Sequence, residues 1–286
     1  MSKSLVSDYF SCISDTLPYL KSYFGKVFVI KYGGSVMSNP SVKLQFIRDL
    51  CFLYFCGINI ILVHGGGPSI SKWLSRLNIQ TKFKSGVRVT DTQTMEIVEM
   101  VLVGKINKEL VLSFNLEGVP SIGLSGKDAG LITARPSSNE EDNLVGLVDN
   151  VDIRLLNLLL ANKYVPVISP IASGNNNKTY NINADTVAGA ISSSLKADKL
   201  ILLTDAPGVM RNLGDSSTLI KELDINYANQ LKKDSIISGG MIPKVDCCIS
   251  ALECGVKSTH IIDGNKKHAL LHEILTDDRM GSMITL

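Results

Sequence analysis

The chain has 286 residues, of which 45% are hydrophobic and 20% are charged, and its formal net charge is +2. This length suits one large or two medium domains, and a balanced charge without a long run of one sign argues against a nucleic-acid-binding surface. Six cysteines without a CxxC pair indicate small core residues in a reducing compartment.

Neither a membrane span nor a leader peptide is predicted. The longest apolar stretch, 51–63, is interrupted by Gly57 and Asn59 and is shorter than the roughly 20 residues that a span needs. The N-terminal segment lacks the basic start and apolar run of a signal peptide, and Asp8 and Asp15 make a transit peptide a poor interpretation.

Residues 1–25 are predicted to form a helical arm in front of the first strand. Apolar side chains recur there at helical spacing from Leu5 to Leu20, and Pro18 is expected to break or redirect the helix. Two interpretations stay open for this arm: it packs on its own core, or it contacts another subunit.

From Lys26 onward the chain alternates between strand-like and helix-like segments. This alternation predicts an α/β fold with a mostly parallel sheet and helices on both faces. Two further segments, 82–91 and 131–149, are predicted to be hairpins with polar tips that project over a site. We expect strands at 27–31, 58–63, 119–124, 165–169, 200–205 and 259–263, and helices at 42–55, 69–77, 92–115, 153–161, 185–195 and 244–254.

Glycines follow the first two predicted strands. The segment "KYGGS" supplies Lys31 and Gly34, and "HGGGPS" supplies Gly66 and Gly67 at the start of a helix. Ligands of open parallel sheets bind at the carboxyl ends of the strands, and glycines let the backbone come close to an anion. The plain alternatives are a lysine that reaches the surface and a turn that only allows close packing.

Other phosphate-binding motifs are absent from the sequence. No GK[ST] completes a Walker A loop, and the GxGxxG spacing of a dinucleotide site is missing. Lys127 in "SGKDAG" is interpreted as a solvated loop charge, and His64 as a residue with a structural hydrogen bond. His268 and His272 are four residues apart, but they lack the carboxylate partners that a metal site would need.

The later strand ends carry further candidates. In "NINAD", Asn181 could bind a ligand, and Asp185 either caps a helix or holds nearby lysines in place. "LLTDAPGV" places Thr204 and Asp205 at a strand end. "SGGMIPKV" places Lys244 in the first turn of a helix, where the helix dipole disfavours a cation, so an anionic partner is expected.

Two lysines, glycine-rich turns and one organising aspartate together predict a phosphate site. No serine–histidine or cysteine–histidine couple is evident, and no general base is evident either. A carboxylate substrate needs no base, because its reference pKa of about 4.3 leaves it ionised at neutral pH. Such an enzyme needs alignment and stabilisation of charge.

The ordered motifs "KYGGS", "HGGGP", "GVRVTD", "NINAD", "LLTDAPGV" and "SGGMIPK" resemble those of the amino acid kinase family. The resemblance runs from Lys26 to the C-terminus and is strongest to members that act on N-acetyl-L-glutamate in arginine biosynthesis. It implies a three-layer αβα sandwich with an acyl-substrate lobe at 26–195 and an ATP-binding lobe at 196–286. The implied reaction is phosphorylation of the γ-carboxylate by ATP, which gives N-acetyl-L-glutamyl 5-phosphate.

The resemblance also implies roles for the acyl-substrate residues. Gly66 and Gly67 would bind N-acetyl-L-glutamate through backbone N–H groups, and Asn181 would hold it near its α-carbon. Arg88 would clamp the α-carboxylate, for which its bidentate geometry is suited.

The remaining implied roles concern ATP. Lys31 and Lys244 would stabilise the transferring phosphoryl group, and Asp185 would orient both lysines. Gly34 would donate a hydrogen bond to phosphate oxygens. Mg²⁺ would be held largely by the ATP phosphates, so no protein ligand is named for it. The adenine and ribose side would be lined by Thr204, Asp205 and Gly208.

Regulation and assembly are implied by the same resemblance. The N-terminal arm is similar to the helix that links dimers into a hexamer, a trimer of dimers, in arginine-sensitive members. Arginine inhibition is implied by Glu273, but Arg279 stands where a glycine is common and puts that feedback in doubt. Photosynthetic relatives are bound by the PII signalling protein. A composition rich in Lys, Ile, Asn and Ser suggests a plastid (chloroplast) stroma, with a bacterial cytoplasm as the alternative.

Rival functions are also open. Aspartokinase shares a similar "KFGGTS" segment but usually carries regulatory domains, and aminoadipate-pathway kinases are harder to separate. Carbamate and uridylate kinases should not need "GVRVTD" with its Arg88. A non-catalytic amino-acid sensor on the same fold would be expected to lose Lys31 or Lys244, and both are present.

Overall fold

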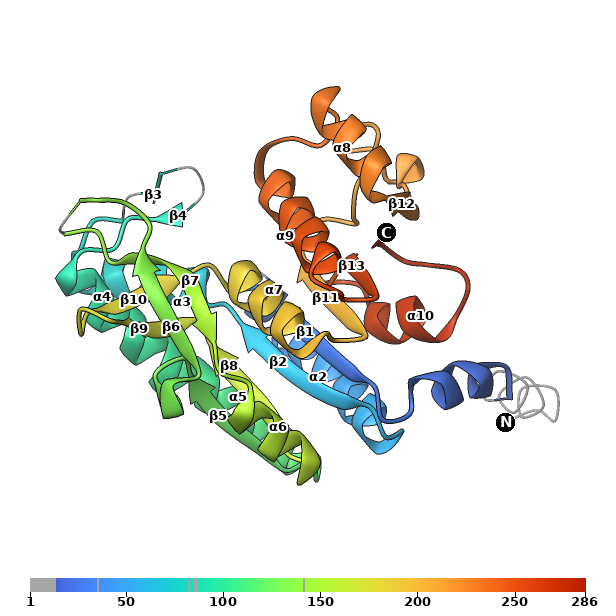
Figure 1. Ribbon diagram of the computed structural model, residues 1–286, viewed down its shortest axis with the longest axis horizontal. Helices are drawn as coiled ribbons and strands as arrows, with labels where there is room; N and C mark the ends of the chain where they lie inside the picture. The colour runs from blue at the N-terminus through green and yellow to red at the C-terminus, as the bar shows by residue number, and fades with distance from the viewer. Residues whose placement is uncertain (1–13, 35, 82, 85–86, 141) are drawn as a thin grey trace.

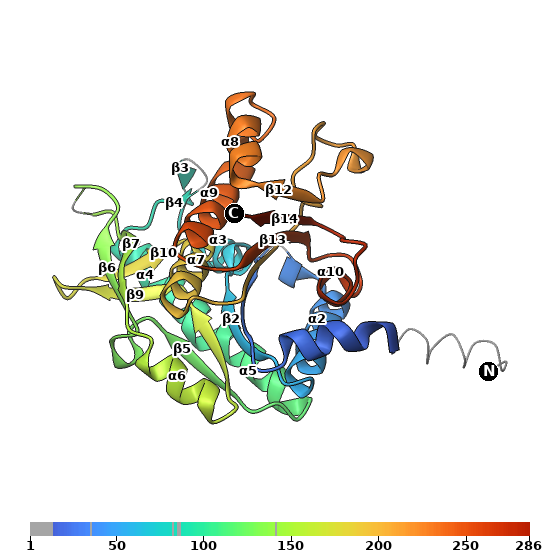
Figure 2. The same ribbon diagram turned by 45° about the vertical axis from the view of Figure 1, so that its right-hand side comes forward.

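One eight-stranded sheet runs through the centre of the protein in the computed structural model, which describes residues 14–34, 36–81, 83–84, 87–140 and 142–286. Its strands lie in the order β12-β14-β13-β11-β1-β2-β8-β5 (Figures 1 and 2). All neighbours are parallel except β13 and β14. The strands are β1 (Val27–Tyr32), β2 (Asn59–His64), β5 (Ser121–Ser125), β8 (Val165–Ser169), β11 (Lys199–Thr204), β12 (Glu222–Asp224), β13 (Ser258–Asp263) and β14 (Ser282–Thr285).

Helices cover both faces of this sheet. α2 and α5 contact each other and the strands β2, β5 and β8, whereas α7 and α9 contact each other and the strands β1, β11 and β13 (Figures 1 and 2). The expected αβα sandwich is therefore confirmed. The helices are α2 (Pro40–Phe55), α3 (Gly67–Arg76), α4 (Thr92–Glu99), α5 (Asn107–Leu116), α6 (Arg154–Ala161), α7 (Ala184–Leu195), α8 (Ile225–Lys233), α9 (Ile242–Glu253) and α10 (Ala269–Leu275).

The central strands are apolar along most of their length because helices cover both of their faces. Phe28, Val29 and Ile30 of β1 are fully buried, as expected for a parallel sheet between two helical layers. The register pairs Tyr32 with His64, so β1 and β2 end side by side. The loops that follow these two strands are thereby brought to the same edge of the sheet.

Both predicted hairpins are confirmed. The first joins β3 (Phe83–Lys84) to β4 (Val87–Arg88), and residues 85–86 at its tip lie outside the described part. The second joins β6 (Ile132–Pro136) to β7 (Val145–Val151). It closes a four-stranded barrel with β9 and β10, which were not predicted because each is short and pairs with distant segments. These two strands are β9 (Ile171–Gly174) and β10 (Thr179–Ile182).

The prediction for Pro18 is wrong. Residues 14–23 form a helix that continues through the proline. Tyr19, Leu20 and Tyr23 pack against the hydrophobic core, and this tertiary packing outweighs the local penalty of the proline. The described part of the arm therefore packs on its own core, while Leu17 stays 48% exposed. Residues 1–13 lie outside the described part.

Two further expectations concern the whole chain. Among the described residues, no helix has both the length and the apolar character needed to cross a bilayer. The proposed boundary at residue 195 coincides with the end of α7, where Lys196 takes a left-handed conformation with φ of 49°. Because β1 pairs with β11, the sheet runs across this boundary, and the division into two lobes stays a prediction.

Candidate active site

The loops after β1 and β2 meet at the carboxyl edge of the sheet. A Cβ added to Gly34 would lie 2.9 Å from the backbone nitrogen of Gly67 and 3.0 Å from that of Gly66. Gly66 and Gly67 open α3, with Pro68 in its first turn, so their N–H groups have no partner within the helix. Any side chain at position 34 would cover these donors. The loops are thus built for close approach of a ligand to backbone N–H groups.

Three charged side chains from three elements meet beside these loops. Lys31 Nζ, on β1, lies 2.8 Å from Asp185 Oδ1, in the first turn of α7. Lys244 Nζ, in the first turn of α9, lies 2.7 Å from Asp185 Oδ2. Lys31 and Asp185 are 8% and 6% exposed. Asp185 is therefore the anion that the position of Lys244 required, and we call these three residues the lysine–aspartate cluster.

Asp185 is not the residue that caps α7. The side-chain oxygen of Asn183 accepts the backbone N–H of Asp185 at 2.8 Å and caps the helix instead. The capping interpretation of Asp185 is therefore wrong, because a neighbouring amide already serves that purpose.

The electrostatics of the lysine–aspartate cluster favour an anionic ligand. Burial alone would raise the pKa of Asp185, but the charges of Lys31 and Lys244 outweigh it and hold that pKa below its ordinary value. The carboxylate is thus ionised at neutral pH and is a poor base. Two ammonium groups face one carboxylate, so the cluster carries excess positive charge, and each ammonium has three N–H donors. It can stabilise a charged oxygen that arrives between the lysines.

A cavity of about 190 Å³ opens beside the triglycine loop, residues 65–67. Arg88 lies in its wall and is 6% exposed. Its Nη2 donates to the carbonyl oxygen of Gly67 at 3.2 Å and to Ser71 Oγ at 2.7 Å, and burial lowers the pKa of Arg88. Asn181 Nδ2, in the same wall, donates to Thr90 Oγ1 at 3.4 Å. The wall consists of Gly65, Gly66, Gly67, Ile70, Arg88, Leu102, Pro170, Asn181, Ile182, Asn183 and Ala184.

The β6–β7 hairpin borders a second, larger cavity of about 420 Å³. Ser137, Ser138 and Asn143 of the hairpin connection face Thr186 of α7 and Pro243 of α9 there. Arg88 lines both cavities, so the two are neighbours. The expectation that the hairpins project over a site agrees with this arrangement.

The nucleotide-side candidates lie at the end of β11. Thr204 Oγ1 donates to Asp205 Oδ1 at 3.1 Å, and Asp205 is exposed. Gly208 has a φ of 145°, and a Cβ there would lie 2.6 Å from Ser282 Oγ. Gly208 is thus a glycine for reasons of backbone conformation and packing against β14, which the sequence pattern did not reveal.

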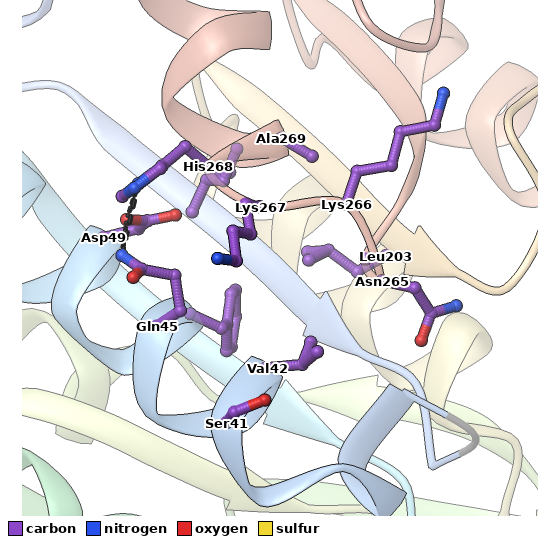
Figure 3. A pocket seen from close by; sticks show the side chains of 13 residues that line it. Ser41, Val42, Gln45, Asp49, Leu203, Asn265, Lys266, Lys267, His268 and Ala269 are labelled. Carbon is purple, nitrogen blue, oxygen red and sulfur yellow. Dashed lines mark hydrogen bonds and ion pairs between the residues drawn. The ribbon is translucent and has the colours of Figure 1, made fainter.

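A separate cavity of about 200 Å³ lies between α2 and the loop before α10 (Figure 3). His268 Nδ1 lies 2.8 Å from Asp49 Oδ1, and Gln45 Nε2 donates to the same oxygen at 3.1 Å. His272 Nδ1 instead lies 3.3 Å from Thr276 Oγ1. His268 precedes α10 in a left-handed conformation, so the two histidines do not share a helical face. The described chain contains no group of three potential metal ligands.

The interpretations of Lys127 as a solvated loop charge and of His64 as a residue with a structural hydrogen bond agree with the structure. Lys127 is exposed and pairs with Glu99 at 2.8 Å. His64 is fully buried, and its Nδ1 lies 3.0 Å from the Gly65 carbonyl oxygen. Its Nε2 accepts from Asn107, a buried amide that sequence reasoning missed. No local signal in the sequence distinguishes Asn107 from Asn115 of the same helix.

Comparison with known proteins identifies the class. The chain belongs to the amino acid kinase family, whose model matches residues 26–263. An acetylglutamate kinase of Gracilaria tenuistipitata var. liui is 53% identical over 275 residues, which are 96% of each chain. One of Porphyra purpurea is 55% identical over 267 residues, 93% of this chain and 94% of the relative. One of Thermosynechococcus vestitus is 52% identical and covers 97% of this chain and 94% of the relative.

Solved structures agree on the fold. The N-acetylglutamate synthase of Neisseria gonorrhoeae complexed with coenzyme A and N-acetyl-glutamate has a TM-score of 0.86 at 22% identity. The match covers 97% of this chain and 63% of that one. The carbamate kinase of Giardia lamblia bound to AMP-PNP has a TM-score of 0.67 at 15% identity and covers 91% of this chain and 98% of that one. At these identities the likeness establishes the fold alone.

Proposed function

We propose that this protein phosphorylates the γ-carboxylate of N-acetyl-L-glutamate with ATP, giving N-acetyl-L-glutamyl 5-phosphate and ADP in arginine biosynthesis. The observation that carries the proposal is the lysine–aspartate cluster, Lys31–Asp185–Lys244, beside a small cavity walled by glycine amides and Arg88. The similarity to acetylglutamate kinases over nearly the whole chain supports the choice of substrate.

The chemistry follows from the charges of the site. A γ-carboxylate oxygen attacks the γ-phosphorus of ATP, the bond to the bridging oxygen breaks, and ADP leaves with that electron pair. No proton moves, because the carboxylate is already ionised. Lys31 and Lys244 stabilise the negative charge on the transferring group while Asp185 holds both lysines in place, and Gly34 donates from its backbone N–H.

The acyl substrate is proposed to lie in the cavity of about 190 Å³ beside the triglycine loop, which we call the acyl cavity. Gly66 and Gly67 donate backbone hydrogen bonds, Arg88 clamps the α-carboxylate, and Asn181 binds near the α-carbon. Arg88 is fixed to the triglycine loop and to Ser71, so its guanidinium is oriented before the substrate arrives. This preorganisation lowers the entropic cost of alignment.

ATP is proposed to bind over the nucleotide lobe along Thr204, Asp205 and Gly208. Mg²⁺ commonly binds through substrate phosphates and keeps several waters. Among the described residues, no cluster of three potential side-chain ligands occurs, and we therefore name no protein ligand for this metal. The metal would supply charge neutralisation on the phosphates, and this chain's residues would supply the alignment and the two ammonium groups.

An ADP-release assay with MgATP tests the function. The substrates are N-acetyl-L-glutamate, L-glutamate, L-aspartate and N-acetyl-aminoadipate, with hydroxylamine present to trap an acyl phosphate as a hydroxamate. Strong activity with N-acetyl-L-glutamate alone is expected. A preference for N-acetyl-aminoadipate would instead assign the protein as an aminoadipate-pathway kinase. Absence of turnover together with tight binding of N-acetyl-L-glutamate or arginine would favour the non-catalytic sensor.

A hexamer, arranged as a trimer of dimers, is proposed from the N-terminal arm. The helix at residues 14–23 lies at one end of the molecule, and Leu17 is 48% exposed (Figure 2). Light scattering should give a hexamer for the full chain and a dimer for a chain that starts at residue 25. A dimer in both cases would contradict the proposal.

Arginine is proposed as a feedback inhibitor, with Arg279 weakening its effect. Arg279 Nε lies 3.0 Å from Glu222 Oε1, and Glu273 is 1% exposed. Titration of activity with L-arginine should show stronger inhibition of Arg279→Gly than of the wild type. Equal inhibition of the variant and the wild type would mean that Arg279 does not weaken the response to arginine.

Two further proposals rest on the origin of the relatives. They come from red algae and cyanobacteria, which supports a location in a plastid stroma or in a cytoplasm. A complex with the PII signalling protein is proposed for the same reason. Calorimetry with a cyanobacterial PII protein tests it, and the absence of heat at micromolar concentrations would reject it.

A further inference from the structure

The long helix beside the triglycine loop changes its winding in the middle. α4, η2 and α5 follow one another without a break, and η2, Met100–Ile106, is wound as a π-helix. A π-turn holds one residue more than an α-helical turn, and such turns are rare and frequent at functional sites. The side chains that η2 presents to the sheet should therefore explain why the π-turn lies at this position.

Two apolar side chains of η2 fill the space over the middle glycine of the loop. A Cβ added to Gly66 would lie 2.5 Å from Ile106 Cδ1 and 2.6 Å from Leu102 Cδ2, so the ends of these two side chains would have to shift to make room for it. Leu102 and Ile106 are 1% and 4% exposed. The π-turn and the triglycine loop are thus fitted to each other at van der Waals distance.

Leu102 also belongs to the wall of the acyl cavity, whereas Ile106 does not. Leu102, Ile70 and Ile182 give this cavity apolar surface, and the polar groups come from other parts of its wall. An N-acylated amino acid has one region that needs an apolar surface, the hydrocarbon end of its acyl group. In a cavity of about 190 Å³, the side chain of Leu102 takes up space that a longer acyl group would need.

A buried hydrogen-bond pair fixes the register of the helix after the π-turn. Asn107, the first residue of α5, donates from Nδ2 to His64 Nε2 at 3.2 Å and to the Val167 carbonyl oxygen at 2.8 Å. Asn107 and His64 are fully buried. His64 Nδ1 carries the proton, because it faces the Gly65 carbonyl oxygen at 3.0 Å, which leaves Nε2 as the acceptor. The helix is thereby tied to the strand that carries the triglycine loop.

We propose that Leu102 sets the length of the acyl group that the enzyme accepts, and that the Asn107–His64 pair is the positioning contact that holds Leu102 there. This inference rests on the proposed function, because it concerns the acyl group of the same substrate. Leu102 contacts the substrate, whereas Asn107 acts only through the π-turn and the triglycine loop.

Substitution of Leu102 tests the first half. The ADP-release assay is run with N-formyl-, N-acetyl-, N-propionyl- and N-butyryl-L-glutamate on the wild type, Leu102→Ala and Val101→Ala. Val101 is the matched control, since it is buried on the same π-turn but does not line the cavity. Because one methylene in an apolar pocket changes kcat/KM by about 10-fold or more, Leu102→Ala should raise the propionyl-to-acetyl ratio by about that factor.

The outcomes separate the two levels of the proposal. A propionyl-to-acetyl ratio that is the same in Leu102→Ala, Val101→Ala and the wild type would overturn the role of Leu102 while leaving the function intact. A wild type that turns over none of the four acyl-glutamates would overturn the proposed function itself.

Substitution of Gly123 tests the positioning half from outside the cavity. Gly123 lies on the edge strand β5, and a Cβ there would overlap Asn107 Oδ1. Gly123→Ala should therefore displace Asn107 without touching any residue of the cavity wall. We expect the KM for N-acetyl-L-glutamate to rise about fivefold or more, with the KM for ATP within about twofold of the wild type.

A second variant covers the case in which Gly123→Ala does not fold. Asn107→Ser removes the bonds to His64 and Val167 without crowding, and it should give the same rise in KM and the same relaxed acyl preference as Leu102→Ala. A lower melting temperature with an unchanged acyl preference in both variants would reduce Asn107 to a structural residue and overturn this half.

Discussion

Two buried clusters in this protein each contain a lysine and a carboxylate, and they are satisfied in opposite ways. In the lysine–aspartate cluster, the two oxygens of Asp185 face one lysine each. In the second cluster, Glu273 accepts from the backbone N–H groups of Met280 and Gly281 at 2.9 and 3.0 Å and lies 2.8 Å from His260 Nδ1. We call this second group the Glu273 cluster.

The two lysine environments differ accordingly. In the Glu273 cluster, Lys199 Nζ lies 3.1 Å from both Ser258 Oγ and His260 Nε2, and burial lowers the pKa of Lys199 to about 8. Its donors thus meet neutral protein acceptors. The lysine–aspartate cluster instead has two ammonium groups for one carboxylate and borders glycine amides. The two clusters therefore differ in charge balance: the lysine–aspartate cluster has one more ammonium group than carboxylates, as the proposed reaction requires, whereas the Glu273 cluster pairs its lysine with neutral acceptors.

Lysine-to-methionine substitutions give the largest expected contrast. Met keeps most of the side-chain volume and removes the charge. Lys31→Met and Lys244→Met should lower kcat by about 10³-fold, because a cation that stabilises a transferring phosphoryl group contributes at least this much. Lys199→Met is the matched control and should keep kcat within about twofold of the wild type. Steady-state kinetics with MgATP and N-acetyl-L-glutamate measure kcat for the three variants. Equal losses of kcat at all three positions would show that the two clusters do not differ in function.

Loss of the Glu273 charge should act on stability and leave the rate alone. Glu273→Gln weakens the pairing with His260 and the two backbone donors in a buried site, so the free energy of unfolding should fall by about 2–3 kcal/mol. Urea unfolding at neutral pH measures this change. The kcat of the folded variant should equal that of the wild type, and a large decrease would mean that the Glu273 cluster takes part in the reaction.

Acid should lower the free energy of unfolding because two histidines, His64 and His260, are buried in the neutral form. Burial lowers the pKa of His64 and of His260 to about 4, from an ordinary value near 6.5. The unfolded chain then binds more protons than the folded one between pH 6.5 and 4, so stability falls as the pH falls through this window. Each histidine contributes about 1.4 kcal/mol per pH unit.

Urea unfolding at pH 7, 6 and 5 measures this dependence. His260→Gln, if folded, should show a smaller loss over the same range, because only His64 then contributes. If the free energy of unfolding depended on pH as steeply in this variant as in the wild type, the assignment of His260 as a neutral residue would be contradicted.

The smallest expected effect concerns Arg88 in the wall of the acyl cavity. Arg88→Lys keeps the charge but loses the planar pair of donors, so the KM for the acyl substrate should rise about 10-fold with little change in kcat. Gln45→Ala, in the separate cavity beside α2, serves as a control with unchanged KM. A normal KM in Arg88→Lys would remove the carboxylate clamp from the site.

The sequence predicts the parts of this protein whose causes are local. The apolar strands and the glycines behind them follow from composition and spacing, and the unfavourable position of Lys244 predicted an anionic partner, which is Asp185. The prediction fails where distant packing decides. Pro18 lies inside a helix because its neighbours pack on the core, and His268 leaves the helical register to meet Asp49.

Several features of the site have no local signal at all. Asn107 is one of two amides in α5, and only the fold brings it to His64 and to the Val167 carbonyl oxygen. The π-turn before it places Leu102 against Gly66, a contact that the sequence does not show. The family resemblance implied a nucleotide-side role for Gly208, yet the surroundings of this glycine are set by β14, a short strand that pairs between two others.

The insertion of β14 between β12 and β13 has a consequence for how the chain assembles. Among the described strands, β12 pairs with β14 alone, and β14 comes about sixty residues later in the sequence. During synthesis, β12 and the α8 that follows it therefore emerge without a partner strand and wait for residues 282–285. Because non-local pairings form slowly, we expect the region of β12 and α8 to be the last to become resistant to proteases. If ATP binds at the proposed residues of this half, a growing chain would form the acyl cavity before it could bind ATP.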